Sequence, residues 1–439
     1  MEEDIIHTKE SVSKTTPRID KILEDAIEKG TRRLAYEAAH DEHLLTGLGI
    51  VREFIKRKKR VCYGGTAMNA LLPPSERFYD PEVDLPDYDF YTPNLEEDVE
   101  ELVEELKKQG FEDVYSKIGI HDGTKKVLVN FTAIADVSHI DAELFGVLFR
   151  RSKLIDGLHY TDENILRMMM YLELSRPRGM LLRWKKVFER LQLINKNFPI
   201  KGCTIAKGAK LEIPFSIRKV ILDFIIEWKR ILCNGPITPL YRAGIQNKDA
   251  VFRIQNGGPV LFTSPDPKLD AAAIKSELGV PNIVLLRHRG RGDIVPERME
   301  LRLGDMTLCI IVKEIACHAY IPFPTEDKRS INIGSLEFLI TLYLSLIIFT
   351  QHSEDVLGQR IQCQVREFIK LIQSNYSASN SQIPIFSLYC RGHQKQFSSL
   401  LREKMKRQQL EKERFGTTRA RRVKRRTTRK STKKNSDGQ

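Results

Sequence analysis

The stretch VCYGGTAMNALLPPSERFYDPEVDLPDYDFYT, residues 61–92, decides the fold and carries the chemistry of this chain. It begins as a short strand, turns at Gly64 and Gly65, and continues as a short helix over residues 66–72 that two prolines end. Adjacent glycines let the backbone approach a ligand without a Cβ in the way. Thr66 is predicted to cap the helix, whose free N–H groups would suit a phosphate.

Two aspartates follow on a second predicted strand, residues 85–92. The period of two places Asp87 and Asp89 on one face and the neighbouring aromatic residues on the other. Two carboxylates side by side repel each other, which favours a bound cation, and Mg²⁺ is the natural partner beside a nucleoside triphosphate. With a third carboxylate, the set would hold two ions about 4 Å apart.

The ordered combination of Gly-Gly, a short helix and Asp-x-Asp on a strand resembles the polymerase-beta-like nucleotidyltransferases. The strings YGGTAMN and DYDFYTP, with TDENILRMMMYLELSRPRGMLLRWKKVFERL at residues 161–191, resemble the catalytic subunit of the poly(A) polymerases of poxviruses and related large DNA viruses. The resemblance covers residues 50–200 and, more loosely, the chain to residue 350. An EF-hand is excluded because its Gly and distal Glu are missing, and a Walker A loop because no Gly-Lys-Ser/Thr follows the glycines.

A third carboxylate is predicted at Asp136, near the end of residues 126–138, a β-branched run that predicts one long strand or a tight pair. An unpaired carboxylate among such neighbours costs several kcal/mol without a cation or donors. The resemblance implies that the third metal-binding or base carboxylate falls here. Asp141 and Asp122 remain alternatives, as does a hydrogen-bonded structural role for Asp136.

The predicted helix after Trp184 carries basic residues that the resemblance places near the nucleotide. Lys186 and Arg190 are four residues apart and share a face, so both would reach one triphosphate, although ordinary surface cations are the alternative. Lys185 points elsewhere and is kept as a further candidate. Asn69, which matches the family string, is a candidate for contact with sugar or base.

The net charge of +13 is concentrated at one end of the 439 residues. Residues 401–439 hold 16 Lys or Arg and 4 Asp or Glu, whereas the first 400 residues hold 55 and 54. The end of this tail has almost no apolar residue and is predicted to be disordered. It is either a solvated or localisation tail or an arm that binds RNA non-specifically. A second basic run, residues 56–60, is either a solvated helix end or a phosphate contact.

Seven scattered cysteines without a CxxC pair argue against a disulfide framework and a zinc site, and favour a reducing compartment. The acidic start excludes a signal peptide at this end. Residues 338–353 are too short and too diluted by polar residues to span a bilayer, and predict a buried helix capped by Ser335. The predicted location is the cytoplasm of an infected host cell, with packaging in the virion as an option, and no membrane partner or secretion.

The predicted fold class is α/β (α+β), with a polymerase-beta-like nucleotidyltransferase domain. Five regions are expected: a helical N-terminal region at 1–59, the catalytic core at 60–145, a helical region completing the nucleotide site at 146–235, a C-terminal α/β domain at 236–400 and the basic tail at 401–439.

The resemblance implies template-independent polyadenylation, in which AMP passes from ATP to the 3′-hydroxyl of single-stranded RNA with Mg²⁺ or Mn²⁺. The aspartates would bind the ions, the Gly-Gly-Thr turn would hold the triphosphate, and the two basic residues would offset the charge of the departing pyrophosphate. A separate processivity subunit and a homodimer are both open as partners. Two rivals remain: a nucleotidyltransferase with another acceptor, such as an oligoadenylate synthase or a tRNA-end enzyme, and a non-catalytic RNA-binding scaffold.

Overall fold

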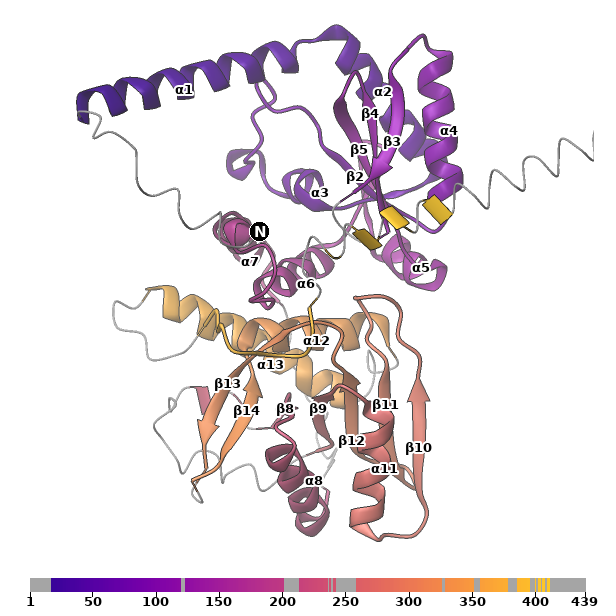
Figure 1. The fold of residues 1–439 in the computed structure, drawn as a ribbon, viewed down its shortest axis with the longest axis vertical. Coiled ribbons are helices and arrows are strands. Elements are labelled where there is room, and N and C mark those ends of the chain that lie inside the picture. Colours follow the sequence, from indigo (N-terminus) through magenta and orange to yellow (C-terminus); the bar gives the residue numbers. More distant parts are fainter. Residues whose placement is uncertain are drawn as a thin grey trace, which may run out of the picture.

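Two β-sheets, each with helices packed against it, form the two halves of the molecule, with helices α6 and α7 between them (Figure 1). The structure, a computed structural model, describes residues 17–119, 123–200, 213–235, 258–325, 328–350, 356–377 and 385–394, with isolated positions at 237, 240, 241, 399, 402, 403, 405, 406, 409 and 410. This arrangement confirms the predicted α/β class with a second α/β unit. The basic tail beyond residue 410 and the fallback residue Asp122 lie outside the described residues.

The first sheet is mixed and, within the described chain, has the strand order β3-β4-β5-β2-β1-β7-β6. Strand β2 pairs in parallel with β5 and antiparallel with β1, and β1 pairs in parallel with β7. The strands are β1 (Val61–Cys62), β2 (Tyr88–Thr92), β3 (Val114–Ile118), β4 (Thr124–Val129), β5 (Thr132–His139), β6 (Lys153–Ile155) and β7 (Leu158–Tyr160). The sheet therefore continues past residue 145, the predicted end of the catalytic core, and the region boundaries stay predictions.

Helices cover this sheet because their apolar faces match its buried surface. Helix α2 (Glu42–Lys58) buries residues such as Val51 and Phe54, and α4 (Leu95–Lys108) buries Val99, Leu102 and Leu106 against it. Helix α4 is therefore amphipathic, with these apolar residues on the face that meets the sheet. The remaining helical elements of this half are α1 (Pro17–Ala39), α3 (Gly64–Leu71), η1 (Pro74–Glu76) and α5 (Ala142–Arg151).

Strands β4 and β5 form a tight hairpin, so the predicted strand-rich run is a pair rather than one strand. Its turn is Asn130–Phe131, and both residues have positive φ, 47° and 66°, as in the turns that match the twist of paired strands. The pairing shifts once, between Val127 and Leu128. Because of this irregularity, Lys126 lies directly opposite Asp136.

The second sheet has, among the described strands, the order β10-β11-β12-β9-β8-β14-β13-β15. Its strands are β8 (Ile231–Leu232), β9 (Val260–Ser264), β10 (Ile283–His288), β11 (Arg298–Leu303), β12 (Met306–Lys313), β13 (His318–Pro324), β14 (Ser330–Gly334) and β15 (Cys390–Arg391). The helices of this half are α8 (Phe215–Glu227), α11 (Pro267–Leu278), α12 (Leu336–Phe349) and α13 (Val356–Ser377). A buried ion pair joins Arg230 to Asp270 on α11 through bonds of 2.7 and 2.8 Å.

Helix α12 confirms the predicted buried helix and links the two halves. Ser335 caps it by accepting a hydrogen bond from the backbone N–H of Phe338 at 3.3 Å. The hydroxyl of Thr341 donates to the carbonyl of Met168 at 3.5 Å, on α6 (Glu163–Leu174). Helix α7 (Trp184–Asn197) follows α6 after the short η2 (Leu181–Arg183). Of the helices that the structure describes, none is long and apolar enough to cross a membrane.

A disulfide between Cys317 and Cys390 corrects the expectation that the cysteines form none. The two are 73 positions apart in the chain, and the pairing of β13 with β15 brings their Cα atoms to 5.3 Å. Spacing in the sequence did not reveal the pair because only the sheet brings these strands together. Among the described cysteines, Cys62, Cys233 and Cys309 are buried thiols.

Candidate active site

The three predicted carboxylates lie together on one face of the first sheet. Asp89 on β2 and Asp136 on β5 are direct partners in the parallel pairing of these strands. Partners on neighbouring strands project from the same face. Asp87 directly precedes β2, and its charge acts on Asp89, which places the two carboxylates near each other. The structure thus brings the predicted set together from two segments almost fifty residues apart.

The environment of these aspartates disfavours negative charge. Burial raises the pKa of the Asp89 carboxyl to about 8, and the charges of Asp87 and Asp136 add to the effect. Desolvation also raises the pKa of Asp87, followed by the charge of Asp136. Three basic side chains oppose that rise at Asp87: Lys126, Lys186 and Arg190. A site of this kind would be stabilised by a bound cation.

Asp136 is held by a lysine that sequence reasoning did not identify. Lys126 Nζ donates to both carboxylate oxygens of Asp136, at 2.7 and 2.6 Å. The residues are cross-strand partners on β4 and β5. The alternation of the strand gives the face of Lys126, but only the register of the hairpin identifies its partner.

Asp141, the fallback for the third carboxylate that the structure describes, has a structural role. Its side chain caps α5 by accepting from the backbone N–H of Glu143 at 3.0 Å and of Leu144 at 3.4 Å. Asp136, in contrast, shares a face with Asp89. The geometry therefore favours Asp136 as the third member of the set.

The Gly-Gly turn packs against the carboxylates and against an aromatic loop. Gly64 has φ +71°, and a Cβ there would lie 2.4 Å from Oδ2 of Asp89. A Cβ on Gly65 would lie 2.1 Å from the hydroxyl of Tyr79 and 2.9 Å from a guanidinium nitrogen of Arg190. A side chain at either position would displace these groups, and at Gly64 the positive φ favours glycine as well.

Thr66 does not cap α3, which corrects the prediction. The helix begins at Gly64 with Tyr63 at the cap position, so Thr66 already lies inside the first turn. Its hydroxyl instead donates to the backbone carbonyl of Asp87 at 2.6 Å. Thr66 thereby ties the Gly-Gly turn to the strand that carries the first two aspartates.

Arg190 lies over an aromatic loop at the edge of the site. Its guanidinium carbon is 4.2 Å from the centroid of the Phe78 ring and 5.4 Å from that of Tyr79. The side chain of Asn69 accepts from the backbone N–H groups of Phe78 at 2.9 Å and of Tyr79 at 3.2 Å. Asn69 thus holds the loop under Arg190, and its predicted contact with sugar or base stays untested.

Helix α7 turns its basic residues toward the aspartates to different degrees. Arg190 is half-buried beside Gly65, and the charge of Lys186 lowers the pKa of Asp87, which places both near the carboxylates. Lys186 and Lys185 are both exposed.

The donor chemistry of the site fits a divalent cation, although the ligands are not preformed. Within the described ranges, no three His, Cys, Asp or Glu side chains converge as a metal site. At the aspartates, Lys126 binds both oxygens of Asp136. Clustered carboxylates suit Mg²⁺ or Mn²⁺, and the side chains that could hold such an ion are those of Asp87, Asp89 and Asp136.

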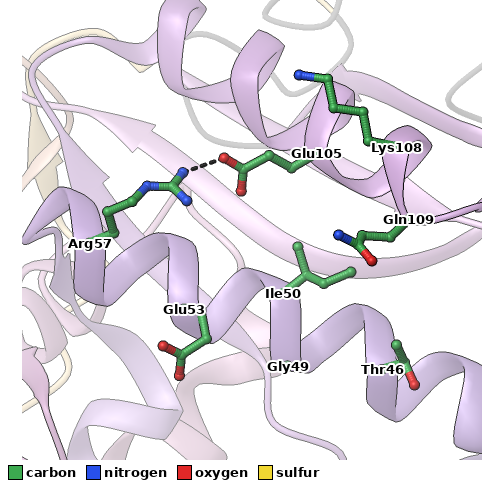
Figure 2. Close-up of a pocket in the computed structure, with 8 residues that line it drawn as sticks. All are labelled: Thr46, Gly49, Ile50, Glu53, Arg57, Glu105, Lys108 and Gln109. Atoms are coloured by element: carbon green, nitrogen blue, oxygen red, sulfur yellow. Dashed lines mark hydrogen bonds and ion pairs between the residues drawn. The ribbon is translucent and has the colours of Figure 1, made fainter.

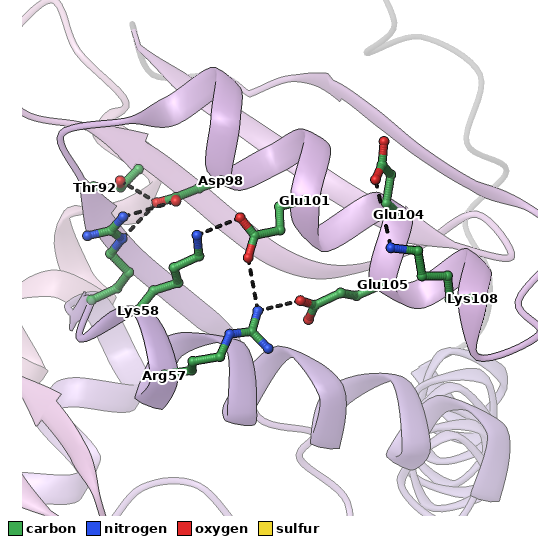
Figure 3. Close-up of polar contacts among 9 residues, drawn as sticks. Arg57, Lys58, Thr92, Asp98, Glu101, Glu104, Glu105 and Lys108 are labelled. Carbon is green, nitrogen blue, oxygen red and sulfur yellow. Dashed lines mark hydrogen bonds and ion pairs between the residues drawn. The ribbon is translucent and has the colours of Figure 1, made fainter.

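The basic run at residues 56–60 forms ion pairs with α4 (Figure 3). Three of its members form ion pairs with acidic residues of that helix: Arg57 with Glu101 and Glu105, Lys58 with Glu101, and Arg60 with Asp98. The Asp98 carboxylate is buried and also accepts from the hydroxyl of Thr92. The run therefore holds α2 to α4, which favours a structural role over a phosphate contact.

A shallow groove between α2 and α4 is separate from the aspartates (Figure 2). It is lined by Thr46, Gly49, Ile50, Glu53, Arg57, Glu105, Lys108 and Gln109. It contains none of the predicted site residues, and its Arg57 and Glu105 already pair with each other.

Part of this chain matches a family of known proteins. Residues 49–180 match the model of the family described as "Poly(A) polymerase catalytic subunit". The resemblance to these catalytic subunits is confirmed.

Two curated relatives carry the name "Putative poly(A) polymerase catalytic subunit". One, from Acanthamoeba polyphaga mimivirus, is 30% identical over 156 residues, which are 35% of this chain and 26% of the relative. The other, from African swine fever virus, is 31% identical over 166 residues, 37% of this chain and 35% of the relative. This chain therefore matches about a quarter to a third of their length.

A solved structure extends the likeness to the whole fold. The Megavirus polyadenylate synthase superposes with a TM-score of 0.73 over 92% of this chain and 85% of its own, at 17% identity. The predicted nucleotidyltransferase fold is thereby confirmed. The poly(A) polymerase family match includes the glycines and the three aspartates but ends before Lys185, Lys186 and Arg190.

Proposed function

We propose that this protein transfers AMP from ATP to the 3′-hydroxyl of single-stranded RNA without a template, as a polynucleotide adenylyltransferase. The observation that carries the proposal is the pairing of Asp89 with Asp136 on adjacent parallel strands, with Asp87 beside them. The Gly-Gly turn at the start of α3 lies against Asp89, so a helix N-terminus, which favours anions, stands beside the carboxylates.

The aspartates of the site would bind and orient the reacting groups. Divalent ions at such carboxylates, when bound, activate an attacking hydroxyl and stabilise a leaving pyrophosphate. Asp87 and Asp89 would hold both ions, and Asp136 would complete one ion site and accept the proton of the RNA 3′-hydroxyl. Asp136 suits this role because it lies directly beside Asp89.

The turn and α7 would hold the triphosphate from two sides. The N–H groups at the start of α3 point outward from Gly64, Gly65 and Thr66, where a helix N-terminus favours anions. Arg190 and Lys186 would offset the charge of the departing pyrophosphate. Phe78 and Tyr79 limit the movement of the Arg190 guanidinium, which lies over their rings.

The partners and location belong to the same proposal. The substrates would be ATP and an RNA 3′ end, with either a separate processivity subunit or a second copy of the chain to keep the RNA bound. The cytoplasm of an infected cell, or the virion, would supply both substrates.

The decisive experiment is extension of a labelled single-stranded RNA with each of the four nucleoside triphosphates and Mg²⁺. The intact protein is compared with the double variant Asp87→Ala/Asp89→Ala. ATP-selective growth of long products that the double variant abolishes is the expected result.

Other outcomes of this experiment distinguish the two alternative functions. Addition of a single nucleotide, or growth only on tRNA-like ends, would indicate a nucleotidyltransferase with another acceptor. Retained RNA binding without extension of any RNA would replace the proposal with the scaffold.

A further inference from the structure

A row of charged side chains crosses four strands of the first sheet. Register pairs Asp89 with Asp136, Asp136 with Lys126, and Lys126 with Lys117, from β2 through β5 and β4 to β3. Directly paired residues share a face, so these four side chains project from the same side of the sheet. The row has two carboxylates at the centre of the sheet and two ammonium groups toward its edge.

The contact at the centre of this row is close. Lys126 Nζ is within 2.6 and 2.7 Å of the two oxygens of Asp136, and both side chains are mostly buried, at 28% and 17% exposure. An ammonium group so placed occupies the lone pairs that a metal ion would need.

The neighbouring lysine provides a built-in comparison. Lys125 is adjacent in sequence, and alternation places it on the opposite face of β4, where it pairs with Glu96 of α4. Its exposure, 16%, is similar to that of Lys126. The two lysines therefore differ mainly in whether the carboxylate they bind belongs to the site.

We propose that Lys126 is a positioning residue that holds Asp136 until divalent ions bind, and thereby sets the metal affinity of the site. The inference rests on the proposed function only for the assignment of Asp136 as a metal ligand. Ion binding must draw at least one oxygen of Asp136 away from Lys126, so the two cations compete for one carboxylate. In the metal-free protein, Lys126 balances the charge of the three aspartates and keeps Asp136 beside Asp89.

Two substitutions of Lys126 should move metal affinity in opposite directions. Lys126→Met removes the competing cation and is expected to lower the Mn²⁺ dissociation constant about threefold to tenfold, the range for a partly exposed ion pair. Lys126→Arg is expected to raise it about threefold, because a guanidinium binds both carboxylate oxygens in a fixed fork. Mn²⁺ binding to the full chain is measured by electron paramagnetic resonance without nucleotide, with thermal melting in EDTA as a check of folding.

Two controls isolate the effect. Lys125→Met removes a comparable ion pair on the opposite face and should leave the Mn²⁺ dissociation constant within about twofold of the wild type. Combining Lys126→Met with Asp136→Asn should cancel the gain, since the contested carboxylate is gone. In RNA extension, the half-saturating Mg²⁺ concentration should follow the same order as the Mn²⁺ dissociation constants.

The outcomes distinguish this inference from the proposed function. The proposed metal site and the inference are both supported by three results together. The wild type binds Mn²⁺, Asp89→Asn abolishes that binding, and the affinity for Mn²⁺ decreases from Lys126→Met through the wild type to Lys126→Arg. If the wild type binds Mn²⁺ but Lys126→Met binds it equally well or more weakly, the competition between Lys126 and the metal ion is overturned, while the metal site stands. Absence of Mn²⁺ binding to the wild type overturns the metal site and the inference with it.

Discussion

The backbone of Gly64 lies against the carboxylate of Asp89, where a Cβ would approach Oδ2 to 2.4 Å. The same glycine has φ +71°, a conformation that side chains disfavour. Two independent constraints therefore select glycine at this position. The contact also limits the rotamers of Asp89 and so aims its carboxylate along the sheet face.

Gly64→Ala should abolish the proposed RNA extension without unfolding the protein. The added methyl would push Asp89 away from Asp136, and a displacement of about 1 Å in a reacting group costs on the order of 100-fold in rate. We expect kcat in RNA extension to fall by at least that factor and Mn²⁺ binding to weaken. Gly49→Ala is the matched control, since nothing lies within 4 Å of a Cβ there and activity should not change. Equal activity of the two variants would show that Gly64 is not part of the site.

Gly65→Ala should affect nucleotide binding more than metal binding. Its Cβ would displace the Tyr79 hydroxyl and the Arg190 guanidinium, which lie at 2.1 and 2.9 Å, but not Asp89. Loss of that positioned cation is expected to raise KM for ATP about tenfold, equivalent to about 1.4 kcal/mol. Steady-state extension kinetics with varied ATP measure this. A change in Mn²⁺ affinity at constant KM for ATP would contradict the assignment.

The raised pKa of Asp89 predicts a pH-dependent stability in EDTA. The folded protein holds this proton up to about pH 8, whereas the unfolded chain releases it near 3.8. The free energy of unfolding should therefore fall as the pH rises between these values, because the folded state binds more protons there. Asp89→Asn lacks this penalty and should exceed the wild type in melting temperature at about pH 8, with the gap closing toward about pH 4.

Added Mg²⁺ provides the control for that measurement. It should stabilise the wild type at about pH 8 by binding the ionised carboxylates, and it should have little effect on Asp89→Asn. A wild-type melting temperature that stays constant or rises between about pH 5 and pH 8 relative to the variant would exclude an uncompensated carboxylate at Asp89.

The pair between Arg230 and Asp270 should be important for the stability of the second half. Both side chains are more than nine-tenths buried and are joined by two hydrogen bonds, so removing one partner leaves an isolated charge. We expect Arg230→Met to destabilise the protein by about 3–5 kcal/mol in urea unfolding. The double variant Arg230→Met/Asp270→Leu should recover much of that loss. Lys219→Met, which breaks an exposed pair with Asp223, should cost less than about 1 kcal/mol.

The sequence predicted those parts of the site that lie within one regular segment. Asp87 and Asp89 stand two residues apart in one predicted strand, so periodicity alone predicts that they share a face, and the Gly-Gly turn follows from its residue types. The prediction of Asp136 as the third carboxylate needed the family resemblance, because its neighbour is set by strand pairing. The buried helix α12 was predictable for the same local reason, since it has a long uncharged run behind a Ser cap.

Contacts that depend on tertiary pairing could not be predicted. Lys126 becomes a partner of Asp136 only through the register of a hairpin with one irregular step. The loop with Phe78 and Tyr79 has no periodicity; the side chain of Asn69 holds it, and Arg190, which lies over it, is more than a hundred residues away in the chain. The Cys317–Cys390 pair likewise depends on β15 joining the second sheet.

The hairpin of β4 and β5 makes the active site sensitive to chain length at a distant turn. Because side chains alternate with a period of two, deleting or inserting one residue at Asn130–Phe131 would slide one strand along the other. Lys126 would then pair with Ala135 or Val137 on the face of α4, and Lys125 or Val127 would stand opposite Asp136. A single-residue indel in an exposed loop would thus act as an active-site mutation, so natural variants of this turn should differ in sequence while keeping its length.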